Sequence, residues 1–115
     1  MEYIKAARGL LEEAKEELQK NNVRQAAEKL WGAAALAVKA YAYWRDGKRL
    51  ASHGELWEYM RVLAREAGAW VREAWMYANG MHVCSYEGWC AREDAEDAYK
   101  RVEKLVGEVA SRVEK

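Results

Sequence analysis

Residues 23–45, VRQAAEKLWGAAALAVKAYAYWR, decide how this chain folds. Apolar side chains recur there at helical spacing on more than one face. One face carries Val23, Ala27, Leu30, Ala34, Val38 and Tyr41, and another carries Ala26, Ala33, Ala37 and Ala40. A helix that is apolar nearly all round must be covered by neighbours on most sides, and its alanines let those neighbours come close. We therefore predict that this stretch is the central helix of a bundle.

The composition predicts one helical domain. A chain of 115 residues is long enough to bury a core of its own, and too short for a second one. Hydrophobic residues make up 51% and charged residues 33%, and there is no proline, which is typical of a helical globular protein. Asn and Gln are sparse while Glu, Lys and Arg are abundant, a bias found in heat-adapted proteins.

The charge pattern limits the classes of partner. Lys and Arg number 19, as do Asp and Glu, so the chain as a whole does not attract nucleic acid and does not repel its own copies. Charges recur every few residues at the N-terminus, which argues against a signal peptide there. The uncharged run from Leu30 to Val38 is far shorter than the roughly 20 residues of a membrane helix. We expect a cytoplasmic protein without a membrane segment.

Four further helices are expected around the central one. The first spans about 3–19 and ends at Asn21-Asn22, because asparagine tolerates the left-handed conformation that closes a helix. The third begins at the capping-box pattern Ser52-His53-Gly54-Glu55 and ends near Gly68. The fourth follows directly, and Asn79-Gly80 is expected to stop or interrupt it before an irregular segment, 82–90. The last begins near Ala91. These elements predict an all-α, up-and-down antiparallel bundle of about five helices.

Two histidines and two cysteines are candidates for chemistry. His82, Cys84 and Cys90 offer zinc-binding atoms, but no fourth ligand is evident and the spacing matches no known zinc pattern, so we predict no metal. The two cysteines are thiols in a reducing compartment, or a disulfide where heat adaptation permits one. His53 follows the basic loop 45–49 and could bind phosphate at a helix start, or simply lie in a solvated loop.

The chain has six tryptophans and seven tyrosines but no phenylalanine. Four of the tryptophans lie near apolar helix faces and are interpreted as core or dimer-interface residues: Trp31, Trp57, Trp70 and Trp75. Tyr41, Tyr43 and Trp44 precede the basic loop with Arg45, Lys48 and Arg49, where a nucleobase could stack beside cations. The chain has no glycine-rich phosphate loop and no dinucleotide fingerprint, so these residues do not demand an enzyme or a cofactor.

Three segments carry a resemblance to a known family: AAEKLWGAAALAVKA (26–40), SHGEL (52–56), and MHVCSYEGW with the acidic helix start that follows (81–97). Together they resemble the HEPN superfamily, the higher eukaryote and prokaryote nucleotide-binding domain, and in particular its archaeal PaREP branch of type one. The resemblance implies a homodimeric helical bundle that binds nucleotides and works with a small nucleotidyltransferase. The positions that match the family are Glu28, Lys29, Lys39, His53, His82, Tyr86 and Glu87.

Some HEPN branches are metal-independent ribonucleases with an arginine a fixed short distance before a histidine. Here Arg49 is too close to His53 and Arg45 is too far. Lys48 has a suitable distance, but lysine lacks the planar fork of arginine. We therefore expect a non-catalytic module that binds a nucleotide or a partner in a groove near Lys39, Arg45, His53 and Tyr86. Two alternatives remain: a ribonuclease with His53 or His82 as general base, and a purely structural interaction domain.

Overall fold

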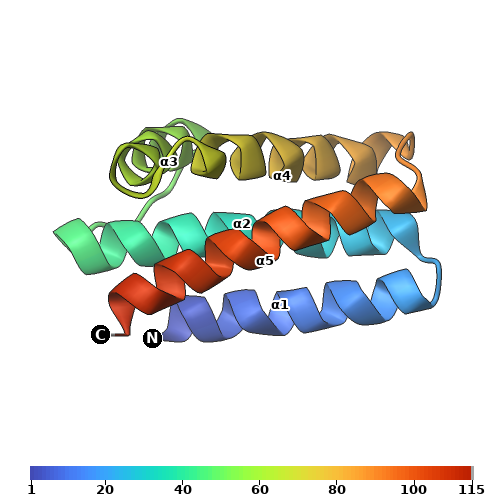
Figure 1. Ribbon diagram of the computed structural model, residues 1–115, viewed down its shortest axis with the longest axis horizontal. Coiled ribbons are helices and arrows are strands. Elements are labelled where there is room, and N and C mark those ends of the chain that lie inside the picture. The colour runs from blue at the N-terminus through green and yellow to red at the C-terminus, as the bar shows by residue number, and fades with distance from the viewer. Residues whose placement is uncertain (115) are drawn as a thin grey trace.

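The computed structural model describes residues 1–114, and within them the chain forms five α-helices and no strand (Figure 1). The helices are α1 (Glu2–Gln19), α2 (Val23–Asp46), α3 (His53–Ala67), α4 (Trp70–Glu87) and α5 (Arg92–Val113). The all-α bundle predicted from the sequence is confirmed. In the part of the chain that is described, no helix combines the length and the apolar character that crossing a membrane requires.

Helix α2 occupies the centre, as predicted, and contacts all four other helices. Its alanines at 26, 27, 33, 34, 37, 40 and 42 are buried, and so are Leu30, Val38 and Tyr41. Small side chains let α1 approach so closely that a Cβ atom at Gly32 would stand 2.8 Å from Cδ1 of Leu10. The alanine-rich sequence of α2 therefore sets the short distance between these helices.

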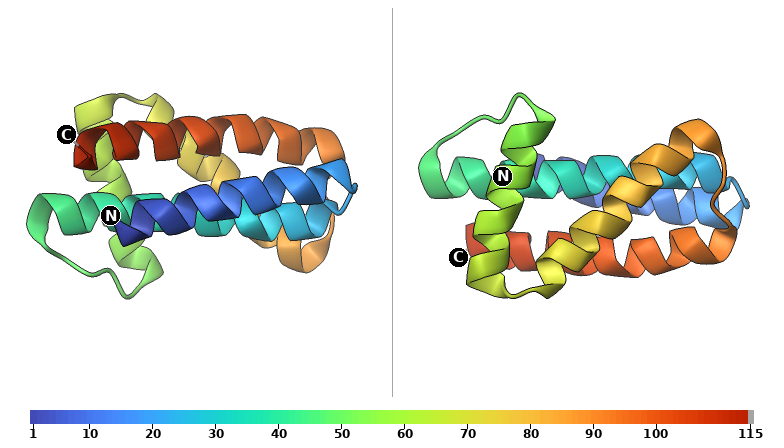
Figure 2. Two further views of the ribbon diagram at one scale, coloured as in Figure 1. Left: turned by 90° about the horizontal axis from the view of Figure 1, so that it is seen from below. Right: turned by 90° about the horizontal axis from the view of Figure 1, so that it is seen from above.

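Four helices alternate in direction, whereas α3 runs across the bundle (Figure 2). The connection from α2 to α3 starts at Gly47, whose left-handed φ of 65° turns the chain out of the helix. Leu50 is buried and anchors this connection. Ser52 then begins α3 in the new direction, and its hydroxyl accepts the Glu55 amide at 3.2 Å. The simple up-and-down order thus holds for α1, α2, α4 and α5.

The helix ends follow the predicted signals closely. Asn21 adopts φ 62° after α1, and Gly68 closes α3. In the capping box at the start of α3, the Glu55 carboxylate accepts from the amide of Ala51 at 2.8 Å, one residue before the position expected. At the start of α5, the Asp94 carboxylate accepts from the amide of Ala91 at 2.8 Å.

The expected interruption at Asn79-Gly80 is wrong, because α4 continues through it to Glu87. Ala78 and Met81 on either side are buried, and this packing outweighs the turn preference of the pair. The Asn79 side chain donates to the Trp75 carbonyl one turn earlier, at 2.9 Å, and so remains compatible with the helix. The irregular segment predicted for 82–90 shrinks to the short link that begins at Gly88, where φ is 72°.

Candidate functional site

Three aromatic rings from three helices meet at the surface. Trp31 comes from α2, His53 is the first residue of α3, and His82 lies in α4. The centroid of the Trp31 ring is 4.7 Å from that of His82 and 5.5 Å from that of His53, both in stacked orientation. The two imidazole centroids are 5.7 Å apart. Two histidines that are distant in sequence therefore share one tryptophan; we call this group the Trp31 cluster.

Further aromatic rings join the Trp31 cluster to the core and to solvent. On the inner side, the ring centroid of the fully buried Trp75 lies 5.2 Å from that of Trp31, and the Trp57 ring packs edge-on against Trp75. On the outer side, the Tyr86 ring meets His82 at 5.2 Å and is 73% exposed. Trp31 is therefore supported from the core side by the buried Trp75, with His82 and Tyr86 on its outer side.

A cleft of about 180 Å³ opens beside Trp31 and His53. Lys39 and Ala35 line it from α2, at the helical spacing that places them on the same face as Trp31. Lys39 is half-buried and forms no ion pair with any residue of the described range 1–114. The start of α3 borders the same cleft through Ser52 and adds the positive end of its helix dipole. The cleft thus combines a cation, an aromatic wall and a helix N-terminus.

One carboxylate already uses part of that positive potential. Glu55 accepts the amide of Ala51, and this hydrogen bond holds the pKa of the Glu55 carboxyl below its ordinary value. Lys48 adds to the effect from 3.8 Å. Since a helix leaves four first-turn amides unpaired, the Ser52 cap and Glu55 do not exhaust the donors at the start of α3.

The basic loop that was expected to complete this site points elsewhere. Arg45 lies between two carboxylates, 3.0 Å from Asp46 and 3.4 Å from Glu66. Lys48 forms an ion pair with Glu55 at 3.8 Å and lies over the ring of Tyr59. The structure therefore brings Lys39, His53, His82 and Tyr86 around Trp31 but places Arg45 and Lys48 outside the cleft. Sequence charge alone could not show which carboxylate each cation would meet.

Asp46, at the end of α2, is held by two neighbours. The Tyr59 hydroxyl donates to its carboxylate at 2.8 Å, and this bond lowers the pKa of Asp46, with Arg45 adding to the effect. The same hydrogen bond raises the pKa of the Tyr59 hydroxyl. These groups tie the end of α2 to α3.

The aromatic residues at the end of α2 do not form one platform. Tyr41 is fully buried, Trp44 is 47% exposed, and Tyr43 lies under the guanidinium of Arg49, whose carbon is 4.9 Å from the ring centroid. Arg49 also donates to the Tyr3 hydroxyl at 3.5 Å, beside a second hollow of about 520 Å³. This second hollow lies apart from the Trp31 cluster and shares no lining residue with its cleft.

Two residues near the Trp31 cluster were missed in the sequence. Trp31 was assigned to the core or an interface, although its spacing to Lys39 placed both on one helix face. Arg24 donates to the carbonyls of Ser85 and Tyr86 and so holds the last turn of α4, which carries Tyr86 and follows the turn with His82. Arg24 is 61 residues from Ser85 in the sequence, so no local pattern pointed to this contact. Glu87, predicted from the resemblance, is exposed at the end of α4.

The cysteines form a disulfide between α4 and the link to α5. Cys84 is fully buried, and its Cα is 5.8 Å from that of Cys90. The alternative with free thiols is therefore wrong for this structure, and the disulfide removes both sulfurs from metal binding. Within residues 1–114, no three His, Cys, Asp or Glu residues are grouped closely enough to hold a metal ion.

Comparisons with known proteins place the chain in a family. No curated protein matches it. A crystal structure of a protein from Sulfolobus solfataricus is similar, with a TM-score of 0.83 and 22% sequence identity over 96% of this chain and 98% of that one. At this identity the likeness shows a shared fold. The model of the archaeal PaREP1/PaREP8 family matches residues 2–106, nearly the whole length, so this chain belongs to the archaeal PaREP1/PaREP8 family.

Proposed function

We propose that this protein is a non-catalytic, HEPN-like binding module that takes a nucleotide at the Trp31 cluster. The observation that carries the proposal is the meeting of Trp31, His53 and His82 beside a cleft that Lys39 lines. Nucleobases stack on aromatic faces, and phosphates bind lysines and helix N-termini. Each of these binding elements lies within the same small area.

The size of the cleft suggests which part of the ligand it holds. Sites for whole ligands usually measure about 300–1,000 Å³, and this cleft measures about 180 Å³. It is therefore suited to one part of a nucleotide. We assign it the phosphate, since Lys39 and the start of α3 are there. We place the base against the half-buried ring of His82 and the exposed ring of Tyr86.

Calorimetric titration of the full chain with ATP, GTP and AMP tests this function. We expect binding that the Lys39→Gln variant weakens about tenfold, because one charge-assisted contact to phosphate is lost. Lys5→Gln is the matched control, since Lys5 is exposed on α1 and does not line the cleft. Absence of heat at millimolar nucleotide, or equal weakening by both variants, would refute the assignment.

The assembly is proposed on separate grounds. We propose a homodimer that works with a small nucleotidyltransferase, supported by the HEPN-like segments in the sequence and by the balanced charge, which does not oppose self-association. The Cys84–Cys90 disulfide and the charge-rich composition fit a heat-adapted archaeal cytoplasm. Co-purification of a nucleotidyltransferase with the tagged protein from its native host would support the partnership, and its absence from repeated preparations would count against it.

A second candidate function is RNA cleavage, favoured by the 5.7 Å between the imidazole centroids of His53 and His82. One imidazole would take the proton of the 2′-hydroxyl while the other protonates the leaving 5′-oxygen, and Lys39 would stabilise the charged phosphate. Arg49 contributes nothing here, because it lies on the Tyr43 ring. Cleavage of RNA in the presence of a chelator, abolished by either His53→Ala or His82→Ala, would establish the ribonuclease over the binding module.

A further inference from the structure

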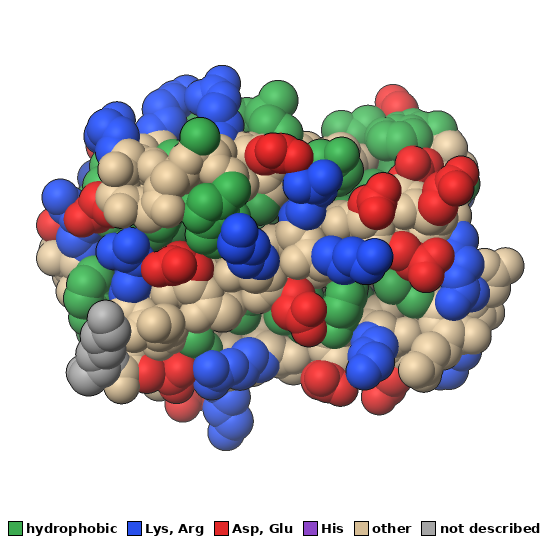
Figure 3. Space-filling view, viewed as in Figure 1, with side chains coloured by type: hydrophobic (Ala, Val, Ile, Leu, Met, Phe, Trp, Pro, Cys, Tyr) green, Lys and Arg blue, Asp and Glu red, His purple; other side chains and the backbone are tan. Residues whose placement is uncertain are grey.

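The outer face of α4 exposes large apolar side chains that the fold does not use. Met76 is 51% exposed and Val83 is 44% exposed, and both lie on the solvent side of the helix, roughly 100–120° around it from His82. Gly80 lies between them, and Trp89, in the link to α5, is 55% exposed beside them. Figure 3 shows hydrophobic side chains gathered over α4 in two groups with a depression between them. Exposed apolar patches of this kind mark interaction sites.

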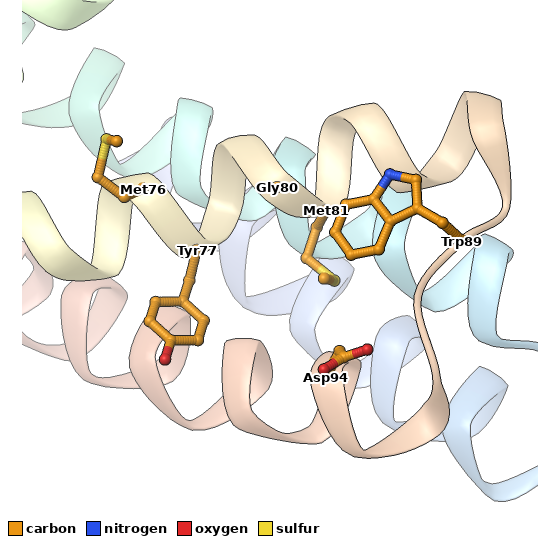
Figure 4. A pocket seen from close by; sticks show the side chains of 6 residues that line it. All are labelled: Met76, Tyr77, Gly80, Met81, Trp89 and Asp94. Atoms are coloured by element: carbon orange, nitrogen blue, oxygen red, sulfur yellow. The ribbon is translucent and has the colours of Figure 1, made fainter.

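The depression is a shallow hollow of about 280 Å³ next to Gly80 (Figure 4). Met76, Tyr77, Met81 and Asp94 line it, together with the Trp89 ring, which closes one side. A Cβ atom at Gly80 would stand 4.0 Å from that ring, so the absence of a side chain at Gly80 leaves room for a partner's side chain to approach the helix backbone. The Cys84–Cys90 disulfide fixes the link that carries Trp89 and keeps the wall in place.

Charges at the two ends of this face have opposite sign. Arg72 lies at the start of α4 and Glu87 at its end, and neither forms an ion pair within residues 1–114. Glu73, next to Arg72, is already bound to Arg101 at 2.7 Å. The same polarity is visible in Figure 3, where basic side chains gather over α3 and the start of α4, and acidic ones surround the end of α4.

We propose that this face binds a second copy of the chain, with the two α4 helices antiparallel and the two-fold axis at Asn79-Gly80. Met76 and Val83 are equally distant from that pair, so each Met76 meets the Val83 of the other copy. Arg72 and Glu87 are also equally distant from it, so the same arrangement joins two pairs of opposite charges. A parallel arrangement would place like charges together. This inference rests on the homodimer of the proposed function and gives it an interface.

Charge reversal tests the arrangement in the full chain by sedimentation velocity. We expect a wild-type dimer whose dissociation constant rises about tenfold in Arg72→Glu and in Glu87→Arg, because each change turns two attractive pairs into two repulsive ones. The double variant Arg72→Glu/Glu87→Arg restores attraction and returns to within about threefold of wild type. The control is Arg65→Glu. Arg65 is exposed on α3, and this variant changes the net charge by as much as Arg72→Glu but should leave the dimer intact.

Three results would overturn the proposed interface. A monomer at every concentration removes both this interface and the homodimer. A dimer that neither single reversal weakens removes the α4 face and leaves the homodimer standing. If the double variant, or the Arg65→Glu variant, dimerises as weakly as the single reversals, the specific pairing of Arg72 with Glu87 is refuted. Nucleotide titration of the Arg72→Glu variant is expected to be unchanged, because Arg72 lies at the start of α4 and does not line the cleft beside Trp31.

Discussion

Replacing Tyr41 by phenylalanine is expected to stabilise the protein. Tyr41 is 0% exposed, and its hydroxyl has no hydrogen-bond partner among residues 1–114. An unpaired buried polar group costs about 1–3 kcal/mol, and phenylalanine removes this group while it keeps the ring in the core. The free energy of unfolding of Tyr41→Phe should therefore rise by about 1–3 kcal/mol. For a chain of this size that raises Tm by roughly 4–12 °C.

Denaturant unfolding followed by circular dichroism measures this change, and Tyr59→Phe is the matched control. It removes the same atoms, but the Tyr59 hydroxyl donates to Asp46 at 2.8 Å, so its loss should lower stability. Opposite signs for the two variants would support the reasoning. A Tyr41→Phe variant less stable than wild type would refute it, because the hydroxyl would then have a hydrogen-bond partner inside the fold.

Three other changes test the packing and the charges of the fold. The Tyr59 hydroxyl lowers the pKa of Asp46, so the Asp46 carboxylate stabilises the fold above its ordinary pKa of 3.8 and loses that effect as the pH falls further. The free energy of unfolding, measured from about pH 5 to about pH 2, should therefore fall less steeply in Asp46→Asn than in wild type. A Cβ atom at Gly107 meets no atom within 4 Å, so Gly107→Ala should raise the free energy of unfolding, measured by thermal unfolding, by about 0.5–1 kcal/mol. A Cβ atom at Gly32 would stand 2.8 Å from Leu10 of α1, so Gly32→Ala should raise it less or lower it. Arg24→Ala should speed amide hydrogen exchange in the last turn of α4, and unchanged exchange there would contradict its role as a cap.

The fold could be predicted where local signals and packing agree. The alanine-rich run of α2 required neighbours on all sides, and Ser52 and Gly68 have the chemistry that helix ends need. The prediction failed at Asn79-Gly80, where a strong turn pair lies between buried apolar residues. Turn preference is a local effect of about 1 kcal/mol, and the burial of a side chain such as Met81 contributes more than that.

The site could be predicted only in parts. His53 and His82 stood out because the chain has two histidines, and Lys39 because it is the only charge between Leu30 and Trp44. Their common neighbour Trp31 did not, since a tryptophan among alanines is also what a core requires. Whether a ring faces the core or a cleft depends on the direction of α3, and no periodicity within a single helix contains that information.

The crossing of α3 follows from the reach of the connection before it. From Asp46 back to Ala35, at the cleft, α2 extends about 16 Å at 1.5 Å per residue. Residues 47–52 form no helix and can span about 20 Å when extended. The connection therefore uses most of its length to run back along α2, and α3 begins beside the middle of that helix instead of at its end (Figure 2). His53 reaches the Trp31 ring for this reason, so the candidate site is a consequence of the one helix that departs from the up-and-down order.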